Sequence, residues 1–277
     1  MRIEDDGRRT DLRDALASPE SVTELSLQSS EPVDGSPAIR ACPNLTTLSL
    51  SAPRVRLDTL KHPKLKRIDI TFAKELELPE DPPERLRWFR LGRCAPMRLP
   101  AFLSRATSLA HLEIDDTPIT TLEGLVRCES LRELVVRGAG LTELPPELAG
   151  LPRLEKLDLA RNQLTHLPLA QGDFPRLEAL SLRANRLTSL PEALGSLATL
   201  RSVDVAENAI ERLPDAMQEL ARLETLVVER NAGIQNVLAV AQALGRKKLR
   251  ALYIRGARLP RGDVQALSAM KRPVVYR

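Results

Sequence analysis

Residues 154–164 read Leu-Glu-Lys-Leu-Asp-Leu-Ala-Arg-Asn-Gln-Leu, and this stretch decides the fold. The same spacing of apolar residues and asparagine, LxxLxLxxNxL with aliphatic substitutes, returns in residues 177–187 and 200–210, with a period of 23 residues. A fixed period in the twenties with this pattern is typical of stacked one-strand units, each of which buries its apolar side only against its neighbours. The sequence therefore predicts a repeat solenoid.

The full unit, LxxLxLxxNxLxxLPxxLxxLxx, resembles the leucine-rich repeat family, in particular its 23-residue intracellular, Ras-suppressor-like class and bacterial proteins with such domains. The resemblance implies an α/β fold: a curved, right-handed solenoid with a parallel β-sheet on the concave face. Short helices, 3₁₀ turns or extended segments are then expected on the convex face. The usual work of such proteins is to bind other proteins.

The repeat is predicted to cover almost the whole chain, which would then be a single domain. We expect an N-terminal capping segment at residues 1–21, repeats at residues 22–260 and a C-terminal cap at residues 261–277. Caps are needed because terminal units would otherwise expose apolar surface. About eleven units are expected, with first apolar residues at positions 22, 45, 65, 86, 109, 131, 154, 177, 200, 223 and 249.

The connections between the strands are predicted to differ along the chain. Between residues 45 and 86 they are short and rich in proline, which favours extended or 3₁₀ backbone over helix. Residues 236–244 have apolar side chains at helical spacing, and the helix is expected to stop at Gly245.

Both ends show short segments that suit a cap. Residues 10–16 form a short amphipathic pattern, which predicts a helix over the first end of the core. At the other end, residues 263–270 predict a helix and residues 274–275 an extended segment.

Composition limits the class of protein. The 277 residues are 43% hydrophobic and only 3% aromatic, as expected for narrow coils that stack aliphatic layers. No apolar run approaches the roughly 20 residues needed to span a membrane, and no secretory h-region follows the first residues. We expect a cytoplasmic protein; delivery into a host cell by a signal-less secretion route remains open.

The cysteines are predicted to be structural. Cys42 and Cys128 each lie three residues before a repeat origin, in a column held elsewhere by leucine, so both are expected in the core. The ninth position of the unit is polar and is expected to bond to backbone amides of the turn. This structural ladder holds Cys94, Thr117, Asn162, Asn185, Asn208 and Asn231.

The sequence does not predict an enzyme, a cofactor or a metal site. It contains no nucleophile with its base, paired catalytic carboxylates, phosphate loop or Cys/His ligand spacing. The alternative is that this chain is the substrate-recognition part of a bacterial effector enzyme, ubiquitin-ligase-like or a transferase, whose catalytic domain lies elsewhere. The excess of 33 arginines over 8 lysines favours a bacterial source with a GC-rich genome.

Successive side chains of a strand point to opposite faces, so the position of a residue in the repeat predicts whether it lies on the surface. Positions 3, 5, 7 and 8 of the unit are expected to project from the concave face. Trp88, the only tryptophan, lies at position 3, with Arg90 two residues on and His111 in the next unit. Tryptophan, tyrosine and arginine are enriched in binding hot spots, so this region is the predicted contact; the alternative is that Trp88 serves packing alone.

Positions 7 and 8 hold an arginine in most units, which predicts a row suited to acidic partners. The alternative is a solvated face in which arginines alternate with acids. We predict a protein partner and no small-molecule substrate. The predicted contact residues are Phe72, Trp88, Arg90, Arg93, His111, Glu113, Asp115, Arg137, Arg161, Arg183, Arg230 and Tyr253.

The positive charge is concentrated at the C-terminal end. Residues 246–277 contain ten lysines and arginines and one acid, whereas the rest of the chain carries a net negative charge. Such a patch attracts an acidic surface. A nucleic-acid site would usually add aromatic side chains for stacking, and only Tyr253 and Tyr276 are near, so the sequence does not favour nucleic acid.

Overall fold

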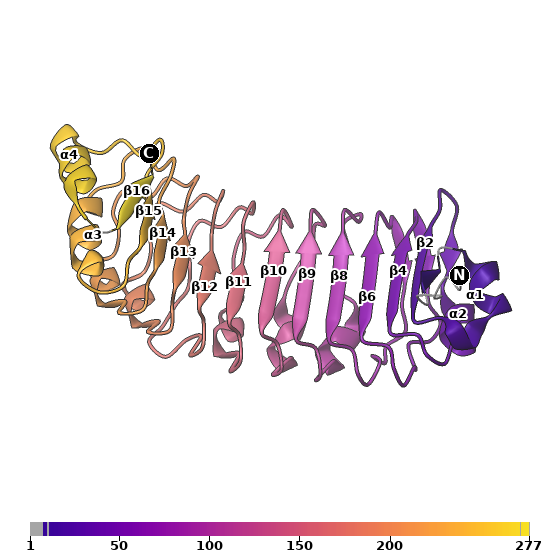
Figure 1. Ribbon diagram of the computed structural model, residues 1–277. Coiled ribbons are helices and arrows are strands. Elements are labelled where there is room, and N and C mark those ends of the chain that lie inside the picture. Colours follow the sequence, from indigo (N-terminus) through magenta and orange to yellow (C-terminus); the bar gives the residue numbers. More distant parts are fainter. Residues whose placement is uncertain (1–7, 10, 272, 277) are drawn as a thin grey trace, which may run out of the picture. The chain divides into compact units, whose positions relative to one another are not determined.

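The computed structural model describes residues 8, 9, 11–271 and 273–276. The chain divides into two compact units, an N-terminal unit up to Leu131 and a C-terminal unit from Arg132 onward. Each unit is built from parallel strands that lie side by side, joined by helical or extended connections (Figure 1). A strand begins two residues after every predicted repeat origin, which confirms the parallel-sheet solenoid. The number of repeats and the single domain stay predictions.

The N-terminal unit contains a sheet in which every described pair of neighbouring strands is parallel. Third positions pair with third positions, so Arg67 lies opposite Trp88 and Trp88 opposite His111. In order across the sheet, its strands are β1 (Arg8–Arg9), β2 (Glu24–Gln28), β4 (Thr47–Ser51), β6 (Arg67–Thr71), β8 (Trp88–Gly92) and β9 (His111–Asp115).

The proline-rich connections of this unit are extended, as predicted, and they also pair with one another. They form a second parallel sheet of β3 (Val33–Asp34), β5 (Arg54–Arg56) and β7 (Glu75–Glu77). This pairing was not predicted from the sequence, because extended backbone alone does not determine which segments pair.

Short helices complete the N-terminal unit. The predicted capping helix is present as α1 (Leu12–Ala17), capped by the Asp11 side chain, which accepts a hydrogen bond from the Arg13 amide at 2.6 Å. Thr10, where we expected this helix to begin, lies outside the described residues. The other helical segments are α2 (Ser36–Ala41), η1 (Pro19–Ser21), η2 (Ala101–Arg105) and η3 (Glu123–Arg127).

The strands of the C-terminal unit also pair in parallel and in sequence order. They are β10 (Glu133–Arg137), β11 (Lys156–Asp158), β12 (Ala179–Ser181), β13 (Ser202–Asp204), β14 (Thr225–Val227), β15 (Ala251–Tyr253) and β16 (Val274–Tyr276). Three 3₁₀ segments connect strands in this unit: η4 (Pro146–Gly150), η5 (Glu192–Ser196) and η6 (Asp215–Glu219).

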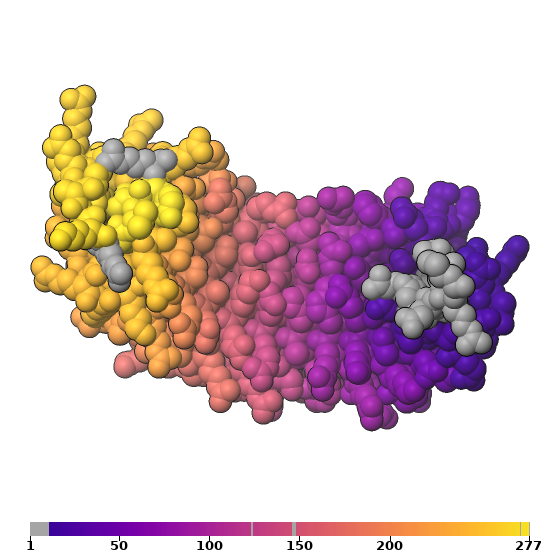
Figure 2. Space-filling view, in the orientation of Figure 1, coloured from indigo at the N-terminus to yellow at the C-terminus, as the bar shows by residue number. Residues whose placement is uncertain are grey.

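The predicted C-terminal helices are confirmed as α3 (Val237–Gly245) and α4 (Arg261–Ala269), and β16 is the predicted final extended segment. In the space-filling view, the last residues (yellow) cover the end of the C-terminal unit (Figure 2). Arg272 and Arg277, two of the bases in the predicted cationic cap, lie outside the described residues.

The core follows the repeat. The first, fourth and sixth residues of every predicted unit are buried, and the most exposed of them is Leu27 at 8%. In the N-terminal unit, Phe89 meets Phe102 edge to face, with ring centroids 5.2 Å apart. Cys42 and Cys128 are fully buried, and burial raises the pKa of the Cys128 thiol to about 11.

The asparagines at position 9 of the unit tie neighbouring turns together. The side-chain amide of Asn208 donates to the carbonyl oxygens of Leu182, Val205 and Ala206 at 2.9–3.1 Å, and its Oδ1 accepts from the Leu187 amide at 3.0 Å. The same pattern is made by Asn162, Asn185 and Asn231.

In the repeats of the N-terminal unit, position 9 holds smaller side chains. The Thr117 hydroxyl accepts a hydrogen bond from the Cys94 amide at 3.0 Å, and the Cys94 sulfur lies 3.5 Å from the Gly92 carbonyl oxygen. Burial raises the pKa of the Cys94 thiol. These contacts replace some of the hydrogen bonds that an asparagine would make at this position.

The eighth position has left-handed backbone in repeat after repeat, a conformation that was not predicted from the sequence. From the unit that starts at Leu65 onward, φ lies between 46° and 71° at Phe72, Arg93, Asp116, Gly138, Arg161, Ala184, Glu207, Arg230 and Gly256. This conformation turns the chain out of the strand. The available signal was Gly138 and Gly256, since glycine adopts positive φ without steric cost.

Candidate interaction surface

Three planar side chains stack side by side across the beginning of β6, β8 and β9. The guanidinium of Arg67 lies 3.6 Å from the centroid of the Trp88 ring. Trp88 also stacks on His111, with centroids 5.4 Å apart and planes 12° from parallel. All three residues occupy position 3 of adjacent units, so the sheet register itself brings them together.

A charged row runs beside this stack, one position-5 residue from each of the same strands. Arg90 lies between two acids: its Nη1 is 3.5 Å from Asp69 Oδ1, and its Nε is 3.2 Å from Glu113 Oε1. His111 Nε2 lies 3.7 Å from the other oxygen of Glu113. We call these six residues, Arg67, Asp69, Trp88, Arg90, His111 and Glu113, the Trp88 cluster.

The charged row is partly buried, and that affects its electrostatics. The side chains of Asp69, Arg90 and Glu113 are 19%, 28% and 23% exposed. Burial raises the pKa of the Asp69 carboxyl, and the charge of Arg90 opposes that rise. The three groups therefore hold one another in place at the surface, which fixes the position of the guanidinium.

Gly92 provides the space that the Arg90 guanidinium occupies. A β-carbon built on Gly92 would lie 3.3 Å from the Cζ of Arg90 and 3.2 Å from the Cγ2 of Thr71, closer than ordinary van der Waals contact. The absence of a side chain at this position lets the long Arg90 side chain run along its own strand.

The structure separates Phe72 and Arg93 from the Trp88 cluster. Both follow the ends of their strands, whereas Trp88 begins β8, and five residues of strand span about 17 Å. The Arg93 guanidinium lies 5.7 Å from the centroid of the Phe72 ring, so these two predicted contact residues form a second group of their own. Asp115 ends β9 opposite Gly92.

Three predicted contact arginines of the C-terminal unit pair with acids of neighbouring repeats. Arg137 donates to Asp158 through Nε and Nη2, at 2.9 and 2.6 Å. Arg183 and Arg230 both donate to the same oxygen of Glu207, at 2.6 and 2.8 Å. Glu207, which interrupts the arginine row in the sequence, bridges it in the structure. These pairs favour the alternative of a self-neutralised charged face. Arg161 is exposed at position 8 of its unit.

Tyr253 lies apart from the other predicted contacts, in β15. It stacks on Tyr276 of β16, with ring centroids 4.4 Å apart and planes 9° from parallel. Tyr276 is 45% exposed, so this pair forms a small aromatic surface at the edge strand of the C-terminal unit.

Two features are absent from the described part of the chain. Within it, no group of three or more histidine, cysteine, aspartate or glutamate side chains is arranged to hold a metal ion. None of its helices has the length and apolar character required to cross a membrane.

The middle of the chain matches a known family model. Residues 129–187 and 175–232 match a family model described as leucine rich repeat. None of the curated proteins compared with the chain matches its sequence.

Several solved structures have the same fold. A Leptospira interrogans LRR protein is 22% identical with a TM-score of 0.77, over 98% of this chain and 70% of that one. An internalin from Listeria monocytogenes is 17% identical with a TM-score of 0.74, over 96% of this chain and 76% of that one. A chain from the octameric complex of Latrophilin 3, Unc5D and the LRR of FLRT2 is 22% identical with a TM-score of 0.63, over 91% and 74%.

At these identities the solved structures show the fold alone. They agree with the family match in the middle of the chain and with the one-strand units and the asparagine hydrogen bonds described above. The chain therefore has the leucine-rich repeat fold, and residues 129–232 match the model of that family.

Proposed function

We propose that this chain is a non-enzymatic interaction module that holds a protein partner on the strand face of its N-terminal unit. The Trp88 cluster would form the centre of the contact. Leucine-rich repeats commonly serve as protein-binding modules, which supports the general class of function. The particular face and residues are our proposal.

The observation that carries the proposal is the stack of Trp88 between Arg67 and His111. A partly buried tryptophan fixed on both sides loses little conformational entropy when a partner covers it, so more of the contact energy remains for binding. Trp and Arg are the residues most enriched at binding hot spots, and here they lie together at adjacent strands.

The charges of the cluster add directional contacts. Arg90 is already oriented by Asp69 and Glu113, and its guanidinium offers five N–H donors in a fixed plane. A partner with backbone carbonyl or amide groups over the stack could bond to this fixed array of donors and acceptors. Complementary polar groups of this kind add specificity more than affinity.

The test compares capture by three forms of the chain. Trp88→Ala with Arg90→Gln removes the ring and the charge at the centre of the cluster. Val126→Ala with Arg127→Gln makes matched changes on η3, where Val126 is 38% exposed and away from the strand face. Circular dichroism and urea unfolding establish that each variant is folded.

Each immobilised form is crosslinked in cytosol from the source organism and from a candidate host, and captured proteins are quantified. We expect at least one protein to be enriched by the unchanged chain and by the η3 control. We expect the cluster variant to lose that protein by about tenfold, the size of a hot-spot substitution. Equal capture by all three folded forms would show that the Trp88 cluster is not the contact surface.

A further inference from the structure

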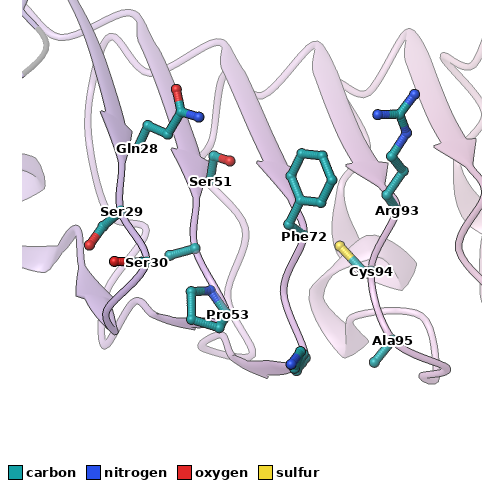
Figure 3. A pocket seen from close by; sticks show the side chains of 11 residues that line it. Gln28, Ser29, Ser30, Ser51, Pro53, Phe72, Arg93, Cys94 and Ala95 are labelled. Atoms are coloured by element: carbon teal, nitrogen blue, oxygen red, sulfur yellow. The ribbon is translucent and has the colours of Figure 1, made fainter.

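A pocket of about 870 Å³ lies at the ends of the strands in the N-terminal unit, separate from the Trp88 cluster. Figure 3 shows Gln28, Ser51, Phe72 and Arg93 projecting on the same side along its length. These residues follow or end β2, β4, β6 and β8, so the pocket runs across four neighbouring strands. Its lining is largely apolar or small.

The pocket forms where the repeats of the N-terminal unit carry smaller residues at positions 8 and 9. In four repeats of the C-terminal unit, position 9 holds an asparagine whose side chain fills the space between successive turns. The corresponding residues of the pocket are Ser30, Pro53 and Cys94, which are smaller or lack an amide. Position 8 is also small at Ser29 and Ala52, so the surface is hollowed between Gln28 and Phe72.

One wall of the pocket is an exposed aromatic ring beside a cation. The Phe72 side chain is 50% exposed, and the Arg93 guanidinium lies 5.7 Å from its ring centroid. Covering an exposed phenylalanine removes apolar surface from water, which favours binding. An apolar group that packs on Phe72 would therefore bind favourably next to a positive charge.

The charge of the pocket is one-sided. It is lined by two cations, Lys74 and Arg93, and the described lining includes no carboxylate. No ion pair is described for either cation, in contrast with Arg137, Arg183 and Arg230 of the C-terminal unit, which pair with acids of neighbouring repeats. Asp115 and Asp116 lie at the end of the adjacent strand and do not line the pocket.

We propose that this pocket binds an extended acidic segment of a partner protein, with carboxylates at the cations Arg93 and Lys74 and an adjacent apolar side chain on Phe72. The pocket crosses strand ends and is bordered by exposed side chains, which suits a chain segment better than an enclosed small molecule. Arginine pairs with carboxylates through parallel hydrogen bonds, which supplies specificity for the acid. The proposal goes beyond the Trp88 cluster and does not depend on it.

The test is a selection from a phage-displayed library of random dodecapeptides on the full immobilised chain. We expect the enriched peptides to share an aspartate or glutamate beside an aromatic or aliphatic residue. A synthetic peptide of the enriched sequence, labelled for fluorescence anisotropy, then gives the affinity. Its counterpart with asparagine or glutamine in place of the acids should bind at least tenfold more weakly.

The variants use substitutions that the backbone accepts. Phe72→Gly removes the ring at a position with φ of 60°, where glycine is favoured, and Arg93→Asp places there the residue type that Asp116 supplies at the same position of the next unit. Both changes together should weaken the peptide at least tenfold. Trp88→Ala with Arg90→Gln should leave the affinity within twofold.

Three results would overturn the proposal: no enriched peptide, enriched peptides without acidic residues, or equal affinity for the folded Phe72→Gly/Arg93→Asp variant. A loss of affinity only in the Trp88 variant would also reject this pocket, while it would support the Trp88 cluster as the contact. The two surfaces are therefore distinguished by the same set of measurements.

Discussion

The guanidinium of Arg137 donates two hydrogen bonds to a single oxygen of Asp158, and the second oxygen of Asp158 accepts from the Ala160 amide at 3.0 Å. The Asp158 side chain is only 8% exposed, whereas that of Arg137 is 37% exposed. The pair therefore joins β10 to β11 through a charge that is largely withdrawn from water.

Removing the arginine should leave that charge without its partner. We expect Arg137→Met to lower the free energy of unfolding by about 1–3 kcal/mol, a range that allows for the solvent exposure of the guanidinium. Urea unfolding measures the change. Arg201→Met is the matched control, because Arg201 and its acidic partners are more exposed, and it should cost about 1 kcal/mol or less. Equal losses would contradict a special role for the Asp158 contact.

Replacing an asparagine at position 9 should lower the free energy of unfolding more than replacing any exposed side chain. Asn231 is fully buried, donates to three carbonyl oxygens and accepts from the Ile210 amide. We expect Asn231→Ala to lower the free energy of unfolding by about 2–5 kcal/mol, because several buried backbone groups lose their partner. Asn231→Thr should recover part of the loss, since Thr117 fills the same position in its own unit. A loss below 1 kcal/mol for Asn231→Ala would contradict this account.

The strands, the core and the terminal helices could be predicted from the sequence because buried apolar residues recur at regular spacing along the chain. A leucine at position 4 or 6 must face inward in every unit, so the pattern determines which face of each strand is buried. The same reasoning placed Trp88, Arg90 and His111 on the exposed face, in adjacent strands.

Side-chain partners and turn conformations could not be predicted in that way. Glu207 interrupts the arginine row in the sequence, yet its side chain bridges Arg183 and Arg230. The position of a residue in the repeat predicts the face on which it lies, but it does not determine the side-chain rotamer. The repeat pattern assigns Phe72 and Trp88 to the same face of the sheet, yet they lie at opposite ends of their strands. The left-handed backbone at position 8 was hidden because arginine, aspartate and alanine occupy it as well as glycine.

The left-handed conformation at position 8 makes a prediction about stability. A residue with a β-carbon pays about 1–2 kcal/mol for positive φ, and glycine avoids that cost while losing about 0.5–1 kcal/mol in chain entropy. We therefore expect Ala184→Gly, where φ is 54°, to leave the free energy of unfolding unchanged or raise it by up to about 1 kcal/mol. Ala193→Gly, in η5, should lower it instead. The opposite order in urea unfolding would contradict the assigned backbone.

Asp204 should give a pH-dependent effect. Burial raises the pKa of its carboxyl above the ordinary 3.8, more strongly than the Ala206 amide and Arg183 lower it. The folded state thus binds the proton more tightly, so this group's contribution is most favourable below pH 3.8 and is lost as pH rises through the raised pKa. Asp204→Asn should be more stable than the unchanged chain at pH 7, and the difference should shrink as the pH falls towards 4.

Urea unfolding at several pH values between about 4 and 7 measures this difference. Glu211→Gln, an exposed change in the same unit, serves as the control and should shift the midpoint little at any of them. A difference that grows as the pH falls would mean that the ion pair with Arg183, at 3.9 Å, outweighs burial.

Gly92 offers the most specific test of the Trp88 cluster, because a single methyl group there should move Arg90 without removing any charge. A β-carbon at this position meets both the Arg90 guanidinium and Thr71 at 3.2–3.3 Å, and the flexible arginine is the group that can move. We expect Gly92→Ala to displace the side-chain Nε–H resonance of Arg90 in NMR spectra. It should also reduce partner capture several-fold while changing the free energy of unfolding by less than about 1 kcal/mol. Gly150→Ala is the control, since its added carbon would meet nothing within 4 Å. If the Arg90 resonance moves and capture does not fall, Arg90 is a structural ion-pair residue and the contact depends on Trp88 and its stacked neighbours.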